Sequence, residues 1–168
     1  MHIDDKGFAF VASVGGIDPG VLAGQRVLIH AEAGPVPGVI GRKPIHLMER
    51  EEQGRALKIH ELWIDIGAKN RKNAEKHISV GDYATVDAGF QELCNDLVCA
   101  RGFDDRAGAF VVVETLRRLQ DRACQVGVYG VSTVQEEIGL RGARTSAYGI
   151  NPHVGIAIDV GFATDYPG

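Results

Sequence analysis

The sequence is poor in cysteine and contains neither a long hydrophobic run nor a cluster of basic residues. Its three cysteines, Cys94, Cys99 and Cys124, form no C-x-x-C pair and no even disulfide framework. This usage is typical of buried free thiols in a reducing compartment, so we expect a cytoplasmic protein. No apolar stretch approaches the roughly 20 residues of a membrane-spanning helix, so no membrane partner is expected. The opening residues MHIDDKGFAF have neither a basic leader nor an apolar core, so we expect no export signal.

The charge balance is slightly acidic. Lysine and arginine number 18 against 22 aspartates and glutamates, for a net charge of −4. Without a basic patch, nucleic acid is not an expected partner. The chain has 168 residues, of which 45% are hydrophobic and 24% charged, as in ordinary globular proteins. This length suits one large domain or two small ones.

The first hundred residues read as short strands separated by turns. Segment 34–44 is rich in glycine and proline, which predicts a broken strand. Segment 68–77 is polar and permits a helix. Short strands at this spacing indicate a small β-barrel or sandwich module. The predicted strands are 7–14, 25–32, 58–67 and 82–90.

The pattern changes near residue 98. A helix is predicted over 104–120, because Val112, Leu116 and Leu119 fall on one helical face. A second helix is predicted over 141–149. The apolar runs 125–134 and 153–161 are typical of strands that are buried on both faces. Strands that alternate with helices in this way predict an α/β domain with a parallel sheet.

Acidic residues gather where the predicted strands end. Ligands of open α/β sheets bind outside the carboxyl ends of the strands. Carboxylates that converge there would repel one another, and a bound cation is the usual way to offset that repulsion. A histidine with several carboxylates suits Zn²⁺, Co²⁺ or Mn²⁺. The residues concerned are His2, Asp4, Asp104, Asp105, Glu136, Glu137 and Asp159.

Each of these residues also has an ordinary structural interpretation. Asp104 and Asp105 could be the N-cap of the following helix and its solvated neighbour. A Glu-Glu pair is usually a solvent-facing helix start, and His2 could belong to a ragged terminus or a tag. Asp159 is harder to explain, because an unpaired carboxylate inside a buried strand is costly. The common placement of these residues at strand ends favours the metal interpretation.

Four segments resemble successive motifs of the M42 metallo-aminopeptidases, the glutamyl and tetrahedral aminopeptidase group. They are HIDDKGF, ARGFDDRAGAF, VQEEIGLRGA and AIDVGFATDYPG. The resemblance covers essentially the whole chain and implies a partial parallel-sheet catalytic domain with an inserted, β-rich, barrel-like dimerisation domain. The implied division is 1–12 and 98–168 for the catalytic domain and 13–97 for the insert. A homo-oligomer that forms through 13–97 is implied as well.

The resemblance also implies the site and its chemistry. Two divalent ions, Zn²⁺ or Co²⁺ with Mn²⁺ as a further option, would activate a bound water for removal of N-terminal residues from peptides. Glu136 would be the general base, and Asp4 would orient His2. A cis peptide bond is implied between Asp104 and Asp105. The family commonly has glutamate where this sequence has Asp5. The implied metal ligands are His2, Asp104, Glu137 and Asp159.

Two departures and two alternatives accompany this resemblance. Family members are about twice as long, and their last metal ligand is a histidine in a later motif that His153 does not match. We therefore expect an incomplete, inactive fragment. One alternative is a non-catalytic oligomerisation module. The other is a glycosidase (endoglucanase), because paired carboxylates also serve glycoside hydrolysis, although that chemistry needs no cluster of His2 with Asp159.

Overall fold

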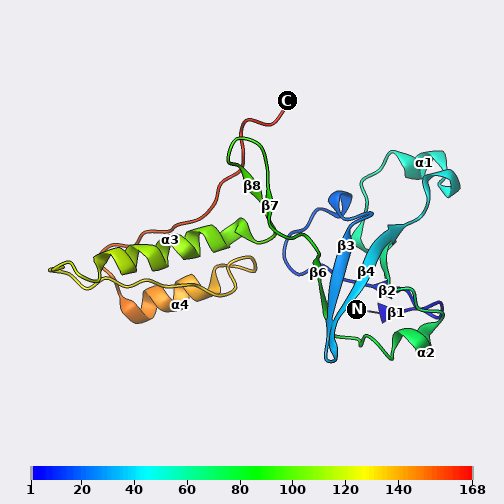
Figure 1. Ribbon diagram of the computed structural model, residues 1–168, viewed down its shortest axis with the longest axis horizontal. Coiled ribbons are helices and arrows are strands. Elements are labelled where there is room, and N and C mark those ends of the chain that lie inside the picture. The colour runs from blue at the N-terminus through cyan, green and yellow to red at the C-terminus, as the bar shows by residue number, and fades with distance from the viewer. Residues whose placement is uncertain (1, 168) are drawn as a thin grey trace. The chain divides into compact units, whose positions relative to one another are not determined.

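The computed structural model describes residues 2–167, and the chain forms two compact units (Figure 1). The first unit is Met1–Ala88 and the second is Gly89–Gly168. Together they make a mixed α/β protein in which every strand pairing is antiparallel within the described residues.

The first unit is built on a six-stranded antiparallel sheet. Its strands lie in the order β1-β2-β5-β4-β3-β6, so the strand at each end of the order has one neighbour. Segments 25–32, 58–67 and 82–90 contain strands as predicted, whereas 7–14 contributes only two residues. The bounds are β1 (His2–Ile3), β2 (Ala9–Phe10), β3 (Arg26–Ala31), β4 (Gly34–Arg42), β5 (Leu62–Asp65) and β6 (Tyr83–Val86).

Short helical turns connect these strands. The predicted helical segment 68–77 contains α2, and the side chain of Asn70 caps it by accepting a hydrogen bond from the backbone N–H of Asn73 at 2.9 Å. The helices of this unit are η1 (Pro19–Val21), η2 (Ile45–Leu47), α1 (Arg50–Gln53), η3 (Ile59–Glu61) and α2 (Arg71–Ala74).

Alternate residues of the strands form the core of the first unit. On β3, Val27 and Ile29 are buried, and on β5 the buried residues are Leu62 and Ile64. Side chains two positions apart lie on the same face of a strand, so these pairs face one core. The hydrophobic core comprises Ile3, Ala9, Leu22, Val27, Ile29, Ile40, Leu62, Ile64, Ala74 and Ile78.

The predicted break in 34–44 is wrong, because β4 runs unbroken over Gly34–Arg42. Pro35 and Pro37 pair with His30 and Leu28 of β3. The other neighbour, β5, pairs with β4 only from Val39 onward. The prolines therefore lie where β4 has a neighbour on one side alone. A missing proline N–H is tolerated at such a strand edge.

Over its described residues, 89–167, the second unit contains two helices and one short hairpin. The strands β7 (Gln91–Glu92) and β8 (Val98–Cys99) pair with each other. The helices α3 (Phe103–Leu119) and α4 (Arg141–Ile150) lie where the sequence predicts them. The peptide bond between Asp104 and Asp105 is cis, which confirms the expectation from the resemblance.

The predicted buried strands over 125–134 and 153–161 are wrong for this chain. Neither segment pairs as a strand within the described residues, and their side chains are exposed, with Val126 73% and Ile156 84% accessible. An extended segment becomes a sheet strand only when a neighbour supplies partners for its N–H and C=O groups. The parallel sheet expected for 98–168 is therefore absent from the described residues.

Segment 125–134 nevertheless lies against both helices of its unit. A side chain at Gly130 would come within 2.5 Å of Leu116 and 3.0 Å of Val112, two residues of the predicted apolar face of α3. A side chain at Gly142 on α4 would come within 2.4 Å of the backbone N of Val134. Two glycines thus allow this segment to approach α3 and α4 closely.

The cysteines do not have the buried environment that the sequence predicts. Cys94, Cys99 and Cys124 are free, but they are exposed, so the prediction that they are buried is wrong. They all belong to the second unit, which buries few side chains.

Of the helices described in residues 2–167, none has the length and apolar character that spanning a membrane requires.

The predicted functional division into 1–12, 13–97 and 98–168 stays a prediction. The structure adds one relevant fact. Residues of 1–12 form β1 and β2, and β2 pairs with β5 through Ala9 and Ile64, so both predicted parts contribute to one sheet. Closure into a barrel and a role in dimerisation likewise stay predictions.

Replacing Ile64 by alanine should destabilise the first unit by about 2–5 kcal/mol, because its side chain is 1% exposed and truncation leaves a cavity. Urea unfolding followed by the fluorescence of Trp63, the single tryptophan, measures this loss. Val39→Ala is the matched control, since Val39 is 48% exposed. Equal stability of the two variants would contradict the assigned core.

Asp105→Ala should weaken the start of α3 by roughly 1 kcal/mol, because Asp105 Oδ1 accepts the backbone N–H of Gly108 at 2.9 Å. Hydrogen exchange at the Gly108 amide should accelerate accordingly. Asp105→Asn keeps an acceptor oxygen and should retain most of the protection. Unchanged exchange in the alanine variant would rule out the cap.

Candidate functional site

The candidate residues divide between the two units. His2 and Asp4 belong to the first unit, and Asp104, Glu136, Glu137 and Asp159 belong to the second.

Asp4 fixes the tight turn between β1 and β2. Its Oδ1 accepts the backbone N–H of Lys6 at 3.0 Å and that of Phe8 at 2.8 Å. Its own N–H donates to the carbonyl of Phe8 at 3.0 Å. Aspartate commonly stabilises turns through such bonds from its carboxylate to nearby backbone. Asp4 therefore has a structural role, which the sequence did not reveal.

His2 lies at the surface of the first unit, against an aromatic ring. It is the register partner of Phe10 across the β1–β2 pair, and the two ring centroids are 5.6 Å apart. Within the described residues, no hydrogen bond joins His2 to Asp4. The assignment of Asp4 as the residue that orients His2 stays a prediction.

The structure distinguishes the two aspartates at the start of α3. Both have non-helical backbone angles, so the regular helix begins after them. Asp105 is half-buried and acts as the cap of this helix through Gly108. The side chain of Asp104 is exposed and makes no hydrogen bond with any described residue. The N-cap interpretation therefore applies to Asp105 and leaves Asp104 available as a ligand.

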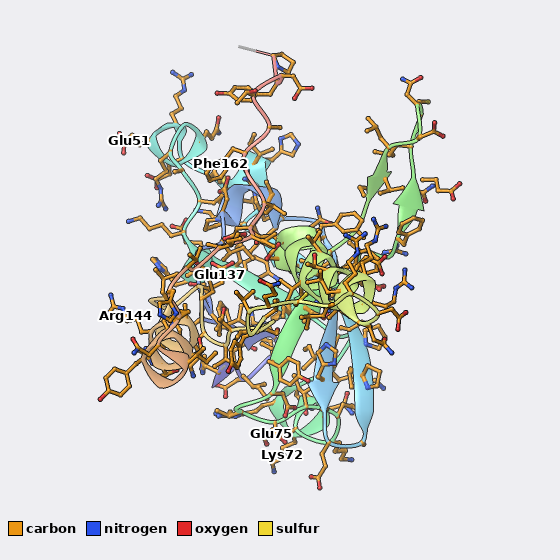
Figure 2. The ribbon with its side chains drawn as sticks, turned by 90° about the vertical axis from the view of Figure 1, so that its left-hand side faces the viewer. Glu51, Lys72, Glu75, Glu137, Arg144 and Phe162 are labelled. Atoms are coloured by element: carbon orange, nitrogen blue, oxygen red, sulfur yellow. The ribbon has the colours of Figure 1, made fainter. Side chains whose placement is uncertain are left out.

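A compact turn presents Glu136 and Glu137 (Figure 2 labels Glu137 in the segment between α3 and α4). The carbonyl of Glu136 accepts the N–H groups of Gly139 and Leu140, each at 3.0 Å. Gln135 and Leu140 have left-handed φ angles of 58° and 56°. Such angles are uncommon outside glycine and often occur at functional sites. Sequence reasoning missed these two residues, because neither residue type signals a left-handed conformation.

Asp159 lies in an extended segment near the end of the chain. Its side chain is exposed, and its Oδ1 accepts the backbone N–H of Val160 at 2.7 Å. The prediction that placed it inside a buried strand is wrong, because 153–161 forms no strand pairing in the described residues. The cost of a buried carboxylate therefore does not apply to Asp159 here.

Electrostatics links the acidic residues of the second unit. Partial loss of hydration raises the pKa of Glu136 above its usual value, although the side chain remains exposed. The negative charges of Glu137, Asp159, Asp104 and Asp105 raise it further. Like charges disfavour the ionised form of a carboxyl group. The charges of four carboxylates, from three segments of the chain, therefore raise the pKa of Glu136.

The donor chemistry of this cluster suits divalent cations, since carboxylate oxygens bind Mn²⁺ and Zn²⁺. The carboxylates have not converged, however. Over residues 2–167, no three His, Cys, Asp or Glu side chains come close enough to hold a metal ion.

Three comparisons identify similar proteins. The family model described as M42 glutamyl aminopeptidase matches residues 1–168. The lysyl aminopeptidase of Pyrococcus furiosus is 36% identical over 96% of this chain and 47% of its own length. The chain thus spans about half the length of this curated relative.

Solved structures give the same result. The TET aminopeptidase of a marine sediment archaeon, a member of the Thaumarchaeota, superposes with a TM-score of 0.90 and 37% identity, over 99% of this chain and 48% of that one. The Pyrococcus horikoshii TET1 peptidase can assemble into a tetrahedron or a large octahedral shell. It superposes with a TM-score of 0.70 and 34% identity, over 86% of this chain and 44% of that one. Both the family match and these likenesses extend over most of the sequence, and the chain belongs to the M42 glutamyl aminopeptidase family.

Proposed function

We propose that this chain carries metal ligands and the general base of a dinuclear metallo-aminopeptidase, which removes N-terminal residues from peptides. One observation carries the proposal: the M42 glutamyl aminopeptidase family model matches residues 1–168, including the segments that hold Asp104, Glu136 and Asp159. The negative charges of Glu137, Asp159 and Asp104 also raise the pKa of Glu136. Membership of an aminopeptidase family gives this cluster its chemical context.

The proposed ligands combine one imidazole with three carboxylates: His2, Asp104, Glu137 and Asp159. Asp104 is proposed to bind both ions. Its carboxylate makes no hydrogen bond with any described residue, so its oxygens are available as metal ligands. Zn²⁺ or Co²⁺ matches this mixed set best, with Mn²⁺ a further option. Two such ions, when bound, supply Lewis acidity toward water and the substrate carbonyl.

Glu136 is the proposed general base. It accepts a proton from the attacking water and returns it to the amine that leaves. The turn that holds its backbone, through Gly139 and Leu140, fixes the position from which the side chain acts. Asp105 holds the start of α3 and thereby positions its neighbour Asp104. Asp4 fixes the turn that follows His2.

Peptides are the proposed substrates, and a homo-oligomer that forms through 13–97 is the proposed assembly. The TET1 peptidase, a relative by structure, can assemble into a tetrahedron or a large octahedral shell. A second candidate function, a non-catalytic oligomerisation module, has one observation in its favour. Among residues 2–167, the buried hydrophobic residues of the core all belong to the first unit.

Glu136→Gln, in a polypeptide of full family length that carries this sequence, should lower turnover about 10²–10⁴-fold, because the amide cannot accept a proton. Metal content should not change, since Glu136 is not a proposed ligand. Elemental analysis and release of amine from an aminoacyl anilide measure the two quantities. Glu92→Gln, an exposed glutamate of β7, is the control. Near-normal turnover with normal metal content would remove Glu136 from the mechanism.

The 168-residue chain by itself should bind at most one divalent ion firmly and should show no significant peptidase activity. The ligand count is the reason. One site draws on His2, Asp104 and Asp159, but the other needs a histidine beside Asp104 and Glu137, and His153 is the only histidine after His77. Elemental analysis after dialysis, with an aminoacyl-anilide assay in added Zn²⁺ or Co²⁺, tests this count.

Two firmly bound ions with robust turnover would contradict that prediction. His153→Ala would then show whether His153 replaces the expected histidine. A cellulose assay run beside the anilide assay separates peptidase from glycosidase activity.

A further inference from the structure

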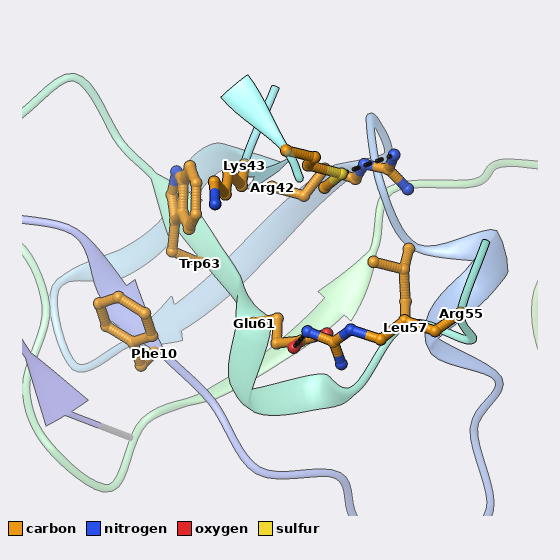
Figure 3. A pocket seen from close by; sticks show the side chains of 8 residues that line it. Phe10, Arg42, Lys43, Arg55, Leu57, Glu61 and Trp63 are labelled. Carbon is orange, nitrogen blue, oxygen red and sulfur yellow. Dashed lines mark hydrogen bonds and ion pairs between the residues drawn. The ribbon is translucent and has the colours of Figure 1, made fainter. Parts of the chain in front are cut away.

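The first unit contains a cavity of about 300 Å³ that the proposed peptidase chemistry does not use (Figure 3). β2, β4 and β5 contribute to its lining, together with residues that follow β4 and α1. All of the lining residues belong to the first unit. A volume of this size is at the lower end of the roughly 300–1,000 Å³ of small-molecule sites.

One part of the cavity lining is aromatic. Phe10 and Trp63 are half-buried, and their ring centroids are 6.5 Å apart. Gly41 lies opposite Trp63 in the β4–β5 pair, and a side chain at Gly41 would come within 2.5 Å of the indole Nε1. The indole ring of Trp63 can lie against the backbone of Gly41 because Gly41 has no side chain. Figure 3 shows these two rings together on one side of the cavity, with Leu57 on the other.

The charged lining is mainly cationic. Arg42, Lys43 and Arg55 contribute positive charge, and among the described lining residues Glu61 is the one that is acidic. Arg55 already forms an ion pair with Glu61. Arg42 is half-buried, and its Nη2 contacts the sulfur of Met48 at 3.9 Å. A guanidinium has five N–H donors and a thioether is a weak acceptor, so Arg42 retains most of its capacity to donate.

We propose that this cavity binds a carboxylate that is carried on an apolar or aromatic body. The planar guanidinium of Arg42 matches a carboxylate, which can accept two parallel hydrogen bonds. The rings of Phe10 and Trp63 suit a planar or apolar group attached to that carboxylate. The C-terminus of a peptide and a small aromatic acid share this chemistry.

The cavity is close to a candidate metal ligand within the same unit. Phe10 lines the cavity and also contacts the ring of His2, at a centroid distance of 5.6 Å. The apolar body of a bound ligand, which the rings of Phe10 and Trp63 would contact, would therefore lie one aromatic ring away from His2. The proposal does not depend on peptidase activity, because binding alone tests it.

Trp63 is the only tryptophan of the chain, so its fluorescence reports on the cavity directly. We expect N-acetyl-phenylalanine to change the emission of the 168-residue chain and to give saturable heat in calorimetric titration. The matched amide, N-acetyl-phenylalanine amide, lacks the carboxylate and should bind at least about tenfold more weakly. Acetate, which lacks the apolar body, should also bind weakly.

Two further ligands distinguish the source of the carboxylate. Preference for acetyl-alanyl-phenylalanine over phenylpropionate indicates a peptide C-terminus, and the reverse preference indicates a small aromatic acid. Tighter binding of phenyl phosphate than of either ligand would overturn the assignment to carboxylates. Absence of saturable heat with every carboxylate at millimolar concentration would overturn the proposal itself.

Arg42→Gln should weaken binding of N-acetyl-phenylalanine by at least about tenfold, because it removes the charged donor. Lys72→Gln is the matched control, since it removes one positive charge of the same unit from a residue that does not line the cavity. Arg42→Lys keeps the charge without the planar fork and should bind with intermediate affinity. Thermal unfolding establishes that each variant is folded. Equal affinity of Arg42→Gln and Lys72→Gln, with both folded, would contradict the role of Arg42.

Discussion

The position of β5 between β2 and β4 is the constraint on which the first unit depends. Ile64 on β5 is the register partner of Ala9 on one side and of Ile40 on the other, and all three are buried. This single row joins the N-terminal hairpin, which carries His2, to the central strands. It also places Trp63, the residue before Ile64, opposite Gly41. Trp63 forms one side of the cavity that is proposed to bind a carboxylate. Packing at Ile64 therefore positions both the candidate ligand and the cavity.

Several elements could be predicted from the sequence, because local patterns determine them. The apolar face of α3 has helical spacing, and Gly130 packs on it through Val112 and Leu116. The prediction of a strand over 25–32 is confirmed by β3, in which every second side chain faces one core. The sequence motifs also identified the family, which the match over residues 1–168 confirms.

Other features depend on distant neighbours and could not be predicted in this way. Whether Pro35 and Pro37 interrupt a strand depends on which side of β4 has a partner. Whether 125–134 becomes a buried strand depends on the presence of adjacent strands, which the run of apolar residues does not reveal. Asp104 and Asp105 are identical in type, and only the backbone path shows that Asp105 is the cap. The site residues themselves thus remain assignments by motif, with the electrostatic grouping around Glu136 in their support.

The extended apolar segments of the second unit have a consequence for the handling of this polypeptide. Segments 125–134 and 153–161 combine hydrophobic side chains with backbone groups that have no strand partner within residues 2–167, and Phe162 is 100% exposed. An unpaired apolar edge is a template for strand addition by another copy. The time for which a solution of this polypeptide stays monodisperse should therefore shorten as chain concentration rises, and charged substitutions on these segments should extend that time.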